Sequence, residues 1–280
     1  MEIESKLNNL KKHLKQLPSI AVAYSGGVDS TFLLKIAHDV LGDKVIAVTA
    51  RSSTYPEREF RDAVKFVREM RISHQVVSFN ELDVPGFADN LPERCYFCKR
   101  EFLSKVVATA HEHNIRHVVE GSNVDDRGDY RPGMQAVREL GVASPLQEAG
   151  LGKEEIRILS RKMDLPTWNK PAFACLASRF PYGQKITRDK LQVVDQAEQF
   201  LMDLGLRQVR VRHHGEIARI EVSPEERSFF FDTDLMDKIY EKFKQLGFLY
   251  TALDLKGYRT GSMNETINVS LQDREQNLRN

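Results

Sequence analysis

The sequence has few cysteines, no long apolar run and almost no net charge. Its 280 residues carry 41 Lys and Arg against 40 Asp and Glu, which leaves a formal charge of +1. This balance creates no overall field for nucleic acid or an anionic membrane, so any anion site must be built locally. No stretch is long and apolar enough to span a bilayer, and the start of the chain lacks the apolar segment of a secretory signal. We therefore expect a cytoplasmic protein that does not bind membranes, with nucleic acid disfavoured as a partner.

The three cysteines are too few, and odd in number, for a disulfide framework. Cys95 and Cys98 form a C-x-x-C pair immediately before an expected helix, and Cys175 lies in a stretch rich in proline and aromatic residues. A C-x-x-C pair taken alone is equally consistent with a redox pair, ordinary thiols or metal ligands. A structural zinc site would need a fourth ligand, whereas a [4Fe-4S] cluster held by three cysteines keeps one iron open.

The pattern of apolar residues in the first half predicts a parallel α/β domain. Apolar runs at 20–24, 45–49, 75–79 and 117–121 alternate with helical stretches at 29–41, 56–70 and 99–113. This alternation is typical of a parallel sheet with helices on both faces. An amphipathic helix that ends before Pro18 precedes the sheet, and a further helix is expected at 153–163.

After about residue 185 the pattern changes to that of a small α+β unit. The expected elements are helices at 189–204 and 224–246 and strands at 208–213, 217–222 and 248–253. A turn at His214-Gly215 predicts an antiparallel hairpin. We therefore expect a first domain at 1–185, a second at 186–268 for substrate binding or oligomerisation, and a polar tail at 269–280.

Directly after the first apolar strand comes the run Ser25-Gly26-Gly27-Val28-Asp29-Ser30, which opens an apolar helix. Consecutive glycines let the backbone turn tightly, and the helix N-terminus offers unpaired N–H groups to an anion. A Walker loop would carry a lysine followed by Ser or Thr after its last glycine, so ordinary γ-phosphate transfer is disfavoured. The simpler interpretation is a tight turn in which Asp29 or Ser30 caps the helix.

This run resembles the SGGxDS signature of the PP-loop ATP pyrophosphatases. The resemblance implies a HUP-type α/β domain that binds ATP, adenylates a substrate and releases pyrophosphate. The residues implied at ATP are Ser25, Gly26, Gly27, Asp29 and Ser30, and Asp29 is also implied at Mg²⁺.

A second loop, at 121–126, also follows a strand and resembles a loop of NAD synthetase and GMP synthetase relatives. Open α/β sheets bind ligands at strand ends, so Gly121 and Asp125 are candidate ATP-binding residues. Arg131 is a candidate partner for a phosphate or carboxylate. Metal or ribose contacts could be shared by the acidic residues Asp125, Asp126 and Asp129. The alternative is that these residues form a solvated turn.

Over nearly the whole chain, further segments resemble the LarE family of ATP-dependent sulfur transferases. These segments are 168–172, 178–183, 209–212 and 254–259, together with Cys175. LarE proteins convert both carboxylates of a pyridinium-3,5-biscarboxylate mononucleotide to thiocarboxylates for the nickel-pincer nucleotide of lactate racemase. The resemblance implies that ATP adenylates a carboxylate and that sulfur then displaces AMP.

Some LarE proteins have a single cysteine that gives up its sulfur, but this chain resembles the three-cysteine type. The resemblance implies a [4Fe-4S] cluster on Cys95, Cys98 and Cys175 that holds sulfide, and sulfur donation by Cys175 itself is the alternative. Lys99, beside the cysteines, is a candidate to steady a carboxylate or the acyl-adenylate. The family also implies a homo-oligomer, a hexamer, that works with other enzymes of nickel-pincer nucleotide synthesis, and the sulfur source stays open.

The phosphate of such a substrate needs cationic partners. Arg210 and Arg212 alternate along an expected strand, which places both side chains on one face. By resemblance, Ser178, Arg179 and Arg259 complete this set. A solvent-facing strand edge is the alternative for the two strand arginines.

Three other functions stay open on the sequence. A tRNA thiolase shares the PP-loop and often a three-cysteine cluster, but the near-zero charge and the lack of further cysteines disfavour it. An amide-forming synthetase related to NAD synthetase would leave the cysteines unexplained. A non-catalytic nucleotide-sensing or iron–sulfur protein would bind ATP without splitting it.

Overall fold

The computed structural model describes residues 2–128, 132–171 and 174–259, and the chain forms two compact units. The units comprise 1–173 and 174–280, so the division falls earlier than the expected boundary near 185. The reason is the helical turn η4 (Leu176–Arg179), whose Arg179 side chain pairs with Glu198 inside the second unit. Cys175 therefore belongs to the second unit.

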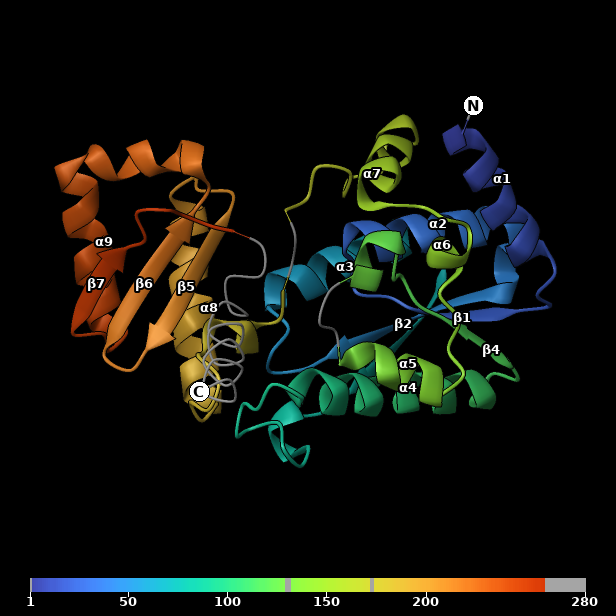
Figure 1. Cartoon of the computed structure of the whole chain (residues 1–280), viewed down its shortest axis with the longest axis horizontal. Coiled ribbons are helices and arrows are strands. Elements are labelled where there is room, and N and C mark those ends of the chain that lie inside the picture. The colour runs from blue at the N-terminus through green and yellow to red at the C-terminus, as the bar shows by residue number, and fades with distance from the viewer. Residues whose placement is uncertain (1, 129–131, 172–173, 260–280) are drawn as a thin grey trace, which may run out of the picture. The chain divides into compact units, whose positions relative to one another are not determined.

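A parallel sheet of four strands forms the centre of the first unit, in the order β3-β2-β1-β4 (Figure 1). Its strands are β1 (Ile20–Ala23), β2 (Val45–Arg51), β3 (Ser73–Ser78) and β4 (His117–Val119). β1 is buried along its whole length and β2 over its first five residues, because helices cover both faces. The expected strands are all confirmed, with ends displaced by a few residues.

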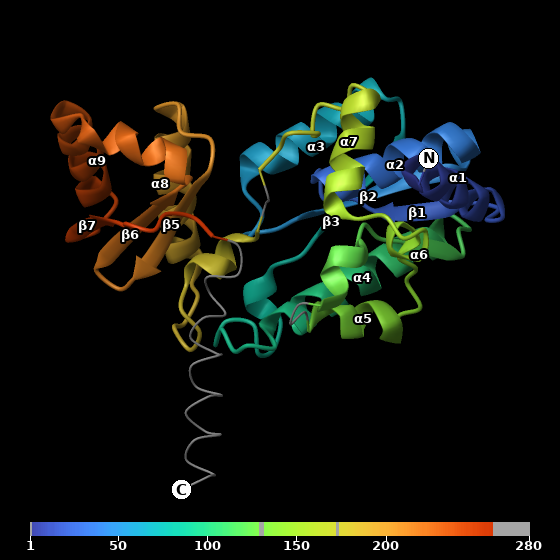
Figure 2. The same cartoon turned by 45° about the horizontal axis from the view of Figure 1, so that its top comes forward.

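Helices lie on both faces of this sheet (Figure 2). One face carries α1 (Glu2–Lys15), α2 (Val28–Leu41), α3 (Glu57–Glu69), α6 (Pro145–Glu148) and α7 (Lys153–Lys162). The other face carries α4 (Arg94–Glu112) and α5 (Gly133–Glu139). Alternate residues of β1 divide between the two cores: Ile20 and Val22 pack with the first group of helices, and Ala21 and Ala23 with the second. The expected α/β class is confirmed.

The chain reverses its direction across the sheet beside β1. From β1 it runs outward through β2 to β3, and it then returns to place β4 on the other side of β1. The carboxyl ends of β1 and β4 therefore flank the crevice at which open α/β sheets bind ligands. The loops that follow these two strands contain the runs 25–30 and 121–126.

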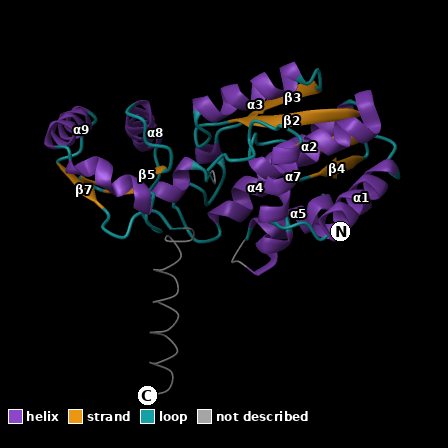
Figure 3. Cartoon of the chain, turned by 90° about the horizontal axis from the view of Figure 1, so that it is seen from above, coloured by secondary structure: helices purple, strands orange, loops and turns teal. Residues whose placement is uncertain are grey.

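The second unit has a sheet of three strands, β5 (Val209–His214), β6 (Ile217–Val222) and β7 (Tyr250–Leu253). Strands β5 and β6 form the expected antiparallel hairpin, whereas β7 runs parallel to β6. Helices α8 (Arg188–Asp203) and α9 (Thr233–Gln245) pack on one face of this sheet around an apolar core (Figure 3). Across the described parts of both units, no helix is long and apolar enough to cross a membrane.

Local contacts explain the differences from the expected helices. The helix expected at 224–246 is split into η5 (Pro224–Phe231) and α9, because Asp232 accepts hydrogen bonds from the N–H groups of Asp234 and Leu235 and caps a new helix. Helix α4 begins at Arg94, so the C-x-x-C pair lies inside the helix and not before it. The short helices α5 and α6 were not expected from the sequence.

Candidate functional site

The first loop closes on itself through its two serines. The N–H of Ser25 donates to Oγ of Ser30 at 3.3 Å, and the two hydroxyl oxygens lie 3.1 Å apart. The hydroxyl of Ser30 also donates to the carbonyl of Gly27 at 3.3 Å. Gly27 is the N-cap residue of α2, and no side chain caps this helix, so the simple capping interpretation is not realised. The first N–H groups of α2 are left for an anion.

Gly26 brings the first loop into close contact with α3. Its φ of 67° lies in the left-handed region, which favours glycine. A Cβ on Gly26 would lie 2.9 Å from the Cβ of Ala63 and 3.4 Å from the hydroxyl of Tyr55. That hydroxyl donates to the carbonyl of Ser25 at 2.5 Å. The loop is therefore supported from outside by α3 and by Tyr55.

Gly26→Ala is expected to distort the first loop and to lower both stability and ATP binding. The left-handed backbone costs alanine about 1 kcal/mol, and the contact with Ala63 adds to this cost. Gly141→Ala is the matched control, since Gly141 has a φ of 62° and nothing lies within 4 Å of an added Cβ. In thermal unfolding, the double variant Gly26→Ala/Ala63→Gly should be less destabilised than the sum of its two single variants, because Ala63→Gly removes the contact although a glycine inside α3 itself costs about 1 kcal/mol. Equal melting temperatures for Gly26→Ala and Gly141→Ala would contradict the close contact.

The second loop lies against the first. A Cβ on Gly121 would lie 3.0 Å from the backbone nitrogen of Ser30 and 3.2 Å from its Cα, so glycine is needed for this approach. Both loops therefore meet at the N-terminus of α2, in the crevice between β1 and β4. This is where a nucleotide phosphate binds in open α/β sheets.

Asp29, in the first turn of α2, lies in surroundings that disfavour its charge. Burial raises its pKa to about 6, and the nearby carboxylate of Asp126 adds to the rise, while Lys153, Arg157 and Asn123 oppose it. Neighbouring carboxylates of this kind suit a divalent cation. No cluster of three His, Cys, Asp or Glu that could hold a metal occurs in the described ranges. A Mg²⁺ ion here would need further ligands from ATP phosphates and water.

In the structure Asp125 contacts the N-terminus of α7. Its Oδ2 accepts a hydrogen bond of 2.6 Å from the N–H of Lys153, at the N-terminus of α7. The charge that acts on Asp29 is that of Asp126, whose Oδ1 lies 3.2 Å from Nζ of Lys153. Asp126 is thus the second carboxylate beside Asp29, and the ATP contact of Asp125 stays a prediction. Two further candidates, Asp129 and Arg131, lie outside the described residues.

Lys99 is held beside the second loop by a buried carboxylate. Its Nζ lies 3.0 Å from Oε2 of Glu120, the residue directly before Gly121. Glu120 also accepts hydrogen bonds from the N–H and hydroxyl of Ser122, at 3.0 and 2.8 Å, and from the hydroxyl of Ser144 at 2.6 Å. The Lys99 side chain is 27% exposed, so its ammonium group can reach a ligand at this loop.

The three cysteines are divided between the two units. Cys95 and Cys98 are three residues apart in the first turn of α4, which places them on the same side of the helix. Cys95 is exposed, Cys98 and Cys175 are half-buried, and none of the three forms a disulfide. Each thiol is thus accessible to some degree, as reactive or ligating cysteines must be. Three thiols are the donor set of a [4Fe-4S] cluster with three cysteine ligands, and the cluster itself stays a prediction.

Arg179 is committed to the interior of the second unit. Its side chain is fully buried and forms a two-point ion pair with Glu198, with Nε–Oε1 and Nη2–Oε2 distances of 2.7 and 3.0 Å. Its Nη1 donates to the carbonyls of Ala174 and Cys175, at 2.8 and 3.2 Å, and to Oγ of Ser178 at 2.8 Å. This geometry does not agree with the phosphate contact expected of Arg179, because its charge is neutralised and no surface is exposed. Arg179 instead fixes the backbone around Cys175.

Arg210 and Arg212 lie on the face of β5 that does not pack on the helices. The alternate residues Val209 and Val211 point into the apolar core on the helical side. Both arginines are only 4% exposed, so the solvent-facing strand edge considered as the alternative is wrong. Arg212 donates to the carbonyl of Ser178 at 2.7 Å, which brings the strand and the η4 turn together.

Like charges crowd together in this buried group of the second unit. Arg179 pairs with Glu198, and Arg212 pairs with Glu221 at 2.7 Å. Burial, followed by the charge of Arg179, lowers the pKa of Arg210 to about 10. A bound phosphate would offset this crowding of like charges. The group therefore supports an anion site beside Ser178.

Arg259 lies at the end of the described residues. Its Nη1 donates to the carbonyl of Gly257 at 3.3 Å and lies 3.7 Å from Oδ1 of Asp254. The side chain is 26% exposed, which leaves it able to contact a ligand. Its position at the edge thus supports a weaker contribution to anion binding than the positions of Arg210 and Arg212.

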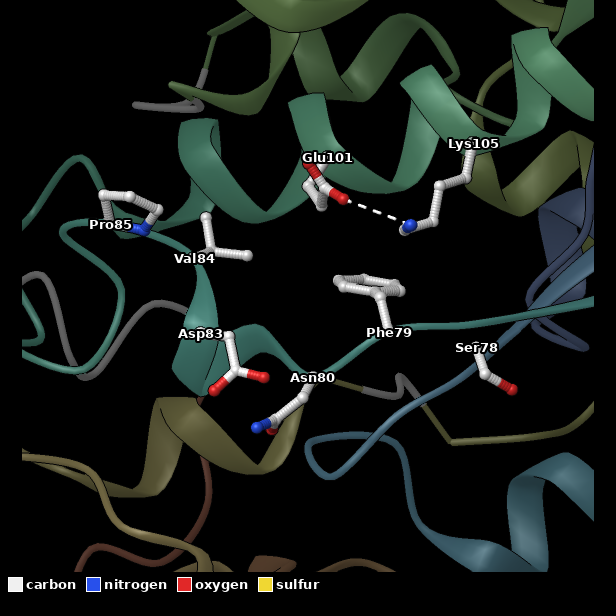
Figure 4. A pocket seen from close by; sticks show the side chains of 8 residues that line it. All are labelled: Ser78, Phe79, Asn80, Asp83, Val84, Pro85, Glu101 and Lys105. Atoms are coloured by element: carbon white, nitrogen blue, oxygen red, sulfur yellow. Dashed lines mark ion pairs between the residues drawn. The ribbon is translucent and has the colours of Figure 1, made fainter.

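A separate cleft opens beyond the end of β3, beside α4 (Figure 4). Glu101 and Lys105 pair at 3.3 Å along its rim, and Asp83 adds a second carboxylate. Because β2 separates β3 from β1, this cleft is not at the crevice between β1 and β4. Its acidic lining also does not suit a phosphate. The cleft is lined by Ser78, Phe79, Asn80, Asp83, Val84, Pro85, Glu101 and Lys105.

Glu120 and Asn123 are site residues that the sequence did not single out. Glu120 accepts a hydrogen bond from the ammonium group of Lys99, which precedes it by 21 residues. A signal was nevertheless present, because an acidic residue at the carboxyl end of a buried strand lies at the edge where ligands bind. Asn123 is fully buried, and its Oδ1 accepts a hydrogen bond of 3.0 Å from the N–H of Asp125 within the second loop.

Comparison with known proteins places these features in context. A family model described as NAD synthase matches residues 2–94. An uncharacterized protein of Synechocystis sp. is 43% identical over 265 residues, which cover 95% of this chain and 99% of that protein. The pyridinium-3,5-bisthiocarboxylic acid mononucleotide synthase of Lactiplantibacillus plantarum is 40% identical over 266 residues, or 95% of this chain and 96% of that protein.

A more distant match reaches only part of the chain. The glutamine-hydrolyzing GMP synthase of Aeropyrum pernix is 27% identical over 218 residues, which cover 69% of this chain and 40% of that protein. The matches to the Synechocystis and Lactiplantibacillus proteins each cover 95% of the chain, so they extend through both units. The matched length therefore spans the segments that carry the nucleotide loops and the arginine group.

Proposed function

This chain belongs to the LarE family of ATP-dependent sulfur transferases, within the PP-loop ATP pyrophosphatases, and we propose that it makes pyridinium-3,5-bisthiocarboxylic acid mononucleotide. In this reaction a carboxylate of pyridinium-3,5-biscarboxylic acid mononucleotide attacks the α-phosphorus of ATP, and the bond to pyrophosphate breaks. A sulfur nucleophile then attacks the acyl carbon, and the bond to AMP breaks. The thiocarboxylate product serves nickel-pincer nucleotide synthesis.

The observation that carries the activation step is the meeting of the two loops at the N-terminus of α2. Gly121 approaches Ser30 closely enough that both loops border one anion site. We assign the pyrophosphate part of ATP to the N–H groups of the run 25–30. Asp29, with Asp126 beside it, would hold the Mg²⁺ that stabilises the leaving pyrophosphate. Lys99 would neutralise the substrate carboxylate or the acyl-adenylate.

We assign the phosphate of the mononucleotide to the buried arginine group. Arg210 and Arg212 supply the charge, Ser178 supplies a hydroxyl, and Arg259 is a further contact at the edge. The burial of these arginines and the charge of Arg179 on Arg210, which lower the pKa of Arg210, support this assignment. Arg179 is assigned instead to holding the backbone of Cys175 in place, because it donates a hydrogen bond to the carbonyl of Cys175.

The cysteines define the sulfur step of the proposal. Cys95, Cys98 and Cys175 would hold the [4Fe-4S] cluster, and when bound it would supply an open iron that carries sulfide. The alternative is that Cys175 gives up its own sulfur. Both chemistries need reduced thiols, so we propose the cytoplasm as the compartment.

The proposed function is tested by incubating anaerobically purified protein with the biscarboxylate mononucleotide, ATP, Mg²⁺ and sulfide. We expect AMP, pyrophosphate and a thiocarboxylate, each measured by mass spectrometry or a coupled assay. Formation of ADP in place of AMP would falsify the adenylation step. A colourless, iron-free protein with full activity would exclude the cluster.

Cysteine variants should separate activation from sulfur transfer. Cys175→Ala is expected to keep the release of pyrophosphate, with AMP set free only as water hydrolyses the acyl-adenylate, while the yield of thiocarboxylate falls by about 100-fold or more. If a cluster is required, Cys95→Ala/Cys98→Ala should fail in the same way and lose its iron. If Cys175 is the donor, the double variant should still complete one turnover. Normal thiocarboxylate yield in Cys175→Ala would contradict both chemistries.

We also propose that the chain forms a homo-oligomer, a hexamer, through its second unit. Several large apolar side chains of that unit are exposed, among them Phe231 at 84%, Leu255 at 83% and Tyr250 at 63%. Exposed apolar surface of this kind favours association. Light scattering coupled to size-exclusion chromatography tests the proposal, and a monomer at working concentration would contradict it.

A further inference from the structure

The phosphate loop carries no lysine of its own, but a lysine from elsewhere in the chain contacts it. The Nζ of Lys170 donates to the carbonyl oxygen of Gly26 at 3.4 Å. The same Nζ lies 2.7 Å from Oε2 of Glu59 and 3.5 Å from Oδ2 of Asp62, two residues of α3. Lys170 is therefore placed where the loop touches α3.

The backbone of Lys170 is held firmly by α7. Arg157 donates from Nη1 to the carbonyl of Trp168 and from Nη2 to the carbonyl of Lys170, both at 2.8 Å. The guanidinium of Arg161 lies 4.9 Å from the centre of the Trp168 ring. The Lys170 side chain is only 16% exposed, so its ammonium group has little freedom to leave the loop.

The carboxylates around the loop create a negative charge that this lysine can offset. Glu59 lies one turn of α3 before Ala63, the residue against which Gly26 packs, and Asp62 lies one turn after Glu59. A pyrophosphate on the loop would meet the negative charge of these two carboxylates. Glu59 is 12% exposed, so solvent screens its charge weakly. A cation between the carboxylates and the ligand removes this repulsion.

We propose that Lys170 is the cation of the phosphate loop and binds the pyrophosphate part of ATP. When the loop is empty, Glu59 and the carbonyl of Gly26 hold the ammonium group. When ATP binds, the phosphate oxygens take over part of these hydrogen bonds, and Glu59 competes with them. The proposal rests on the proposed function only in that ATP binds at 25–30. Lys170 thus supplies from outside the loop the charge that a Walker loop carries within it.

The test measures binding of pyrophosphate, ATP and AMP, each with Mg²⁺, to the full chain by calorimetry. Lys170→Met is expected to weaken pyrophosphate and ATP binding by about 10- to 100-fold, the worth of one charge-assisted hydrogen bond. AMP binding should change by less than about twofold, because AMP lacks the pyrophosphate. Lys170→Arg should retain much of the binding. Lys162→Met is the matched control, since Lys162 pairs with Glu4 on the surface of the same unit.

Glu59→Gln distinguishes ligand binding from a merely structural ion pair. Under the proposal this variant binds ATP at least as tightly as the unmodified protein, because a repelling charge is removed and Lys170 is released. If the pair is only structural, Lys170→Met and Glu59→Gln will weaken all three ligands alike, and that result overturns the proposal. Unchanged pyrophosphate binding in Lys170→Met also overturns it. If Lys170→Met does not fold, the change in ATP affinity of Glu59→Gln alone tests the proposal: tighter or equal binding supports it, and weaker binding overturns it.

If the proposed function is wrong but Lys170 does bind pyrophosphate, the experiments give a result that differs from failure of the Lys170 proposal. The unmodified protein would then bind ATP and pyrophosphate but release no AMP from ATP and the mononucleotide. The order of affinities among the variants at residues 59 and 170 would stay as expected, and the assignment of Lys170 would stand.

Discussion

Asp29→Asn is expected to reduce pyrophosphate release by about 100-fold or more while making the protein more resistant to heat. Burial, together with the charge of Asp126, raises the pKa of Asp29 to about 6, so the folded state disfavours the ionised carboxylate. The ionised form is nevertheless the form that holds Mg²⁺. Asparagine keeps the size and removes the charge, which should stabilise the fold by about 1–2 kcal/mol at neutral pH.

The sign of the pH dependence follows from the raised pKa. The carboxyl titrates near 3.8 in the unfolded chain and at about 6 in the folded protein. Between these values the folded state holds the additional proton, so the destabilising contribution sets in as the pH rises and is complete above about pH 6. The stability gain of Asp29→Asn should therefore be full at about pH 7 and vanish near about pH 4. In the unmodified protein, kcat/KM for MgATP should fall as the pH drops below about 6.

Thermal unfolding across this pH range and a pyrophosphate-release assay check both halves of the prediction. Asp39→Asn is the matched control, because Asp39 lies on the same helix and forms a surface pair with Lys35 at 2.5 Å. Its removal should change the free energy of unfolding by less than about 1 kcal/mol and leave pyrophosphate release unchanged. A lower melting temperature for Asp29→Asn at neutral pH would show that the carboxylate is favoured in the folded state.

Features that depend on near neighbours in the chain could be predicted from the sequence. Strand β1 and the first loop follow from an apolar run that meets Gly26 and Gly27, and the hairpin of β5 and β6 follows from the turn at Gly215. The start of α4 could not be predicted in this way. Its contact is also local, because buried Arg94 hydrogen-bonds to Asn90 four residues earlier, but the φ of 56° at Asn90 is not marked by a glycine in the sequence.

Contacts between distant residues account for the site assignments that changed. The sequence marks Arg179 as a cation, but only the fold brings Glu198 to it. Asp125 accepts a hydrogen bond from the N–H of Lys153, 28 residues later in the chain. Lys170 is separated by 144 residues from the loop carbonyl that it contacts. Periodicity and motif spacing carry no information on such pairs. A prediction from residue type alone therefore names some residues as ligand contacts that the fold uses elsewhere, and it misses other residues that lie at the site.

Arg179→Met is expected to destabilise the second unit by about 3–5 kcal/mol, the cost of breaking a buried ion pair from one side. Burial alone would raise the pKa of Glu198, but the guanidinium of Arg179 outweighs burial and keeps this pKa below its ordinary value. Without Arg179 the carboxylate is left buried and poorly compensated. Urea unfolding measures the loss. Arg219→Met is the control, because Arg219 is 36% exposed and its pair with Glu221 should be worth less than about 1 kcal/mol.

The double variant Arg179→Met/Glu198→Leu separates stability from the placement of Cys175. Replacing both charges by apolar groups should recover more than half of the lost free energy, although the N–H of Val211 loses its acceptor, Glu198. The carbonyls of Ala174 and Cys175 do not regain their donor, so the segment that carries the thiol stays unanchored. The double variant should therefore unfold nearly normally yet form less thiocarboxylate for each AMP released. If that ratio returned to normal together with stability, the ion pair would only hold the fold, and the position of Cys175 would depend on other contacts.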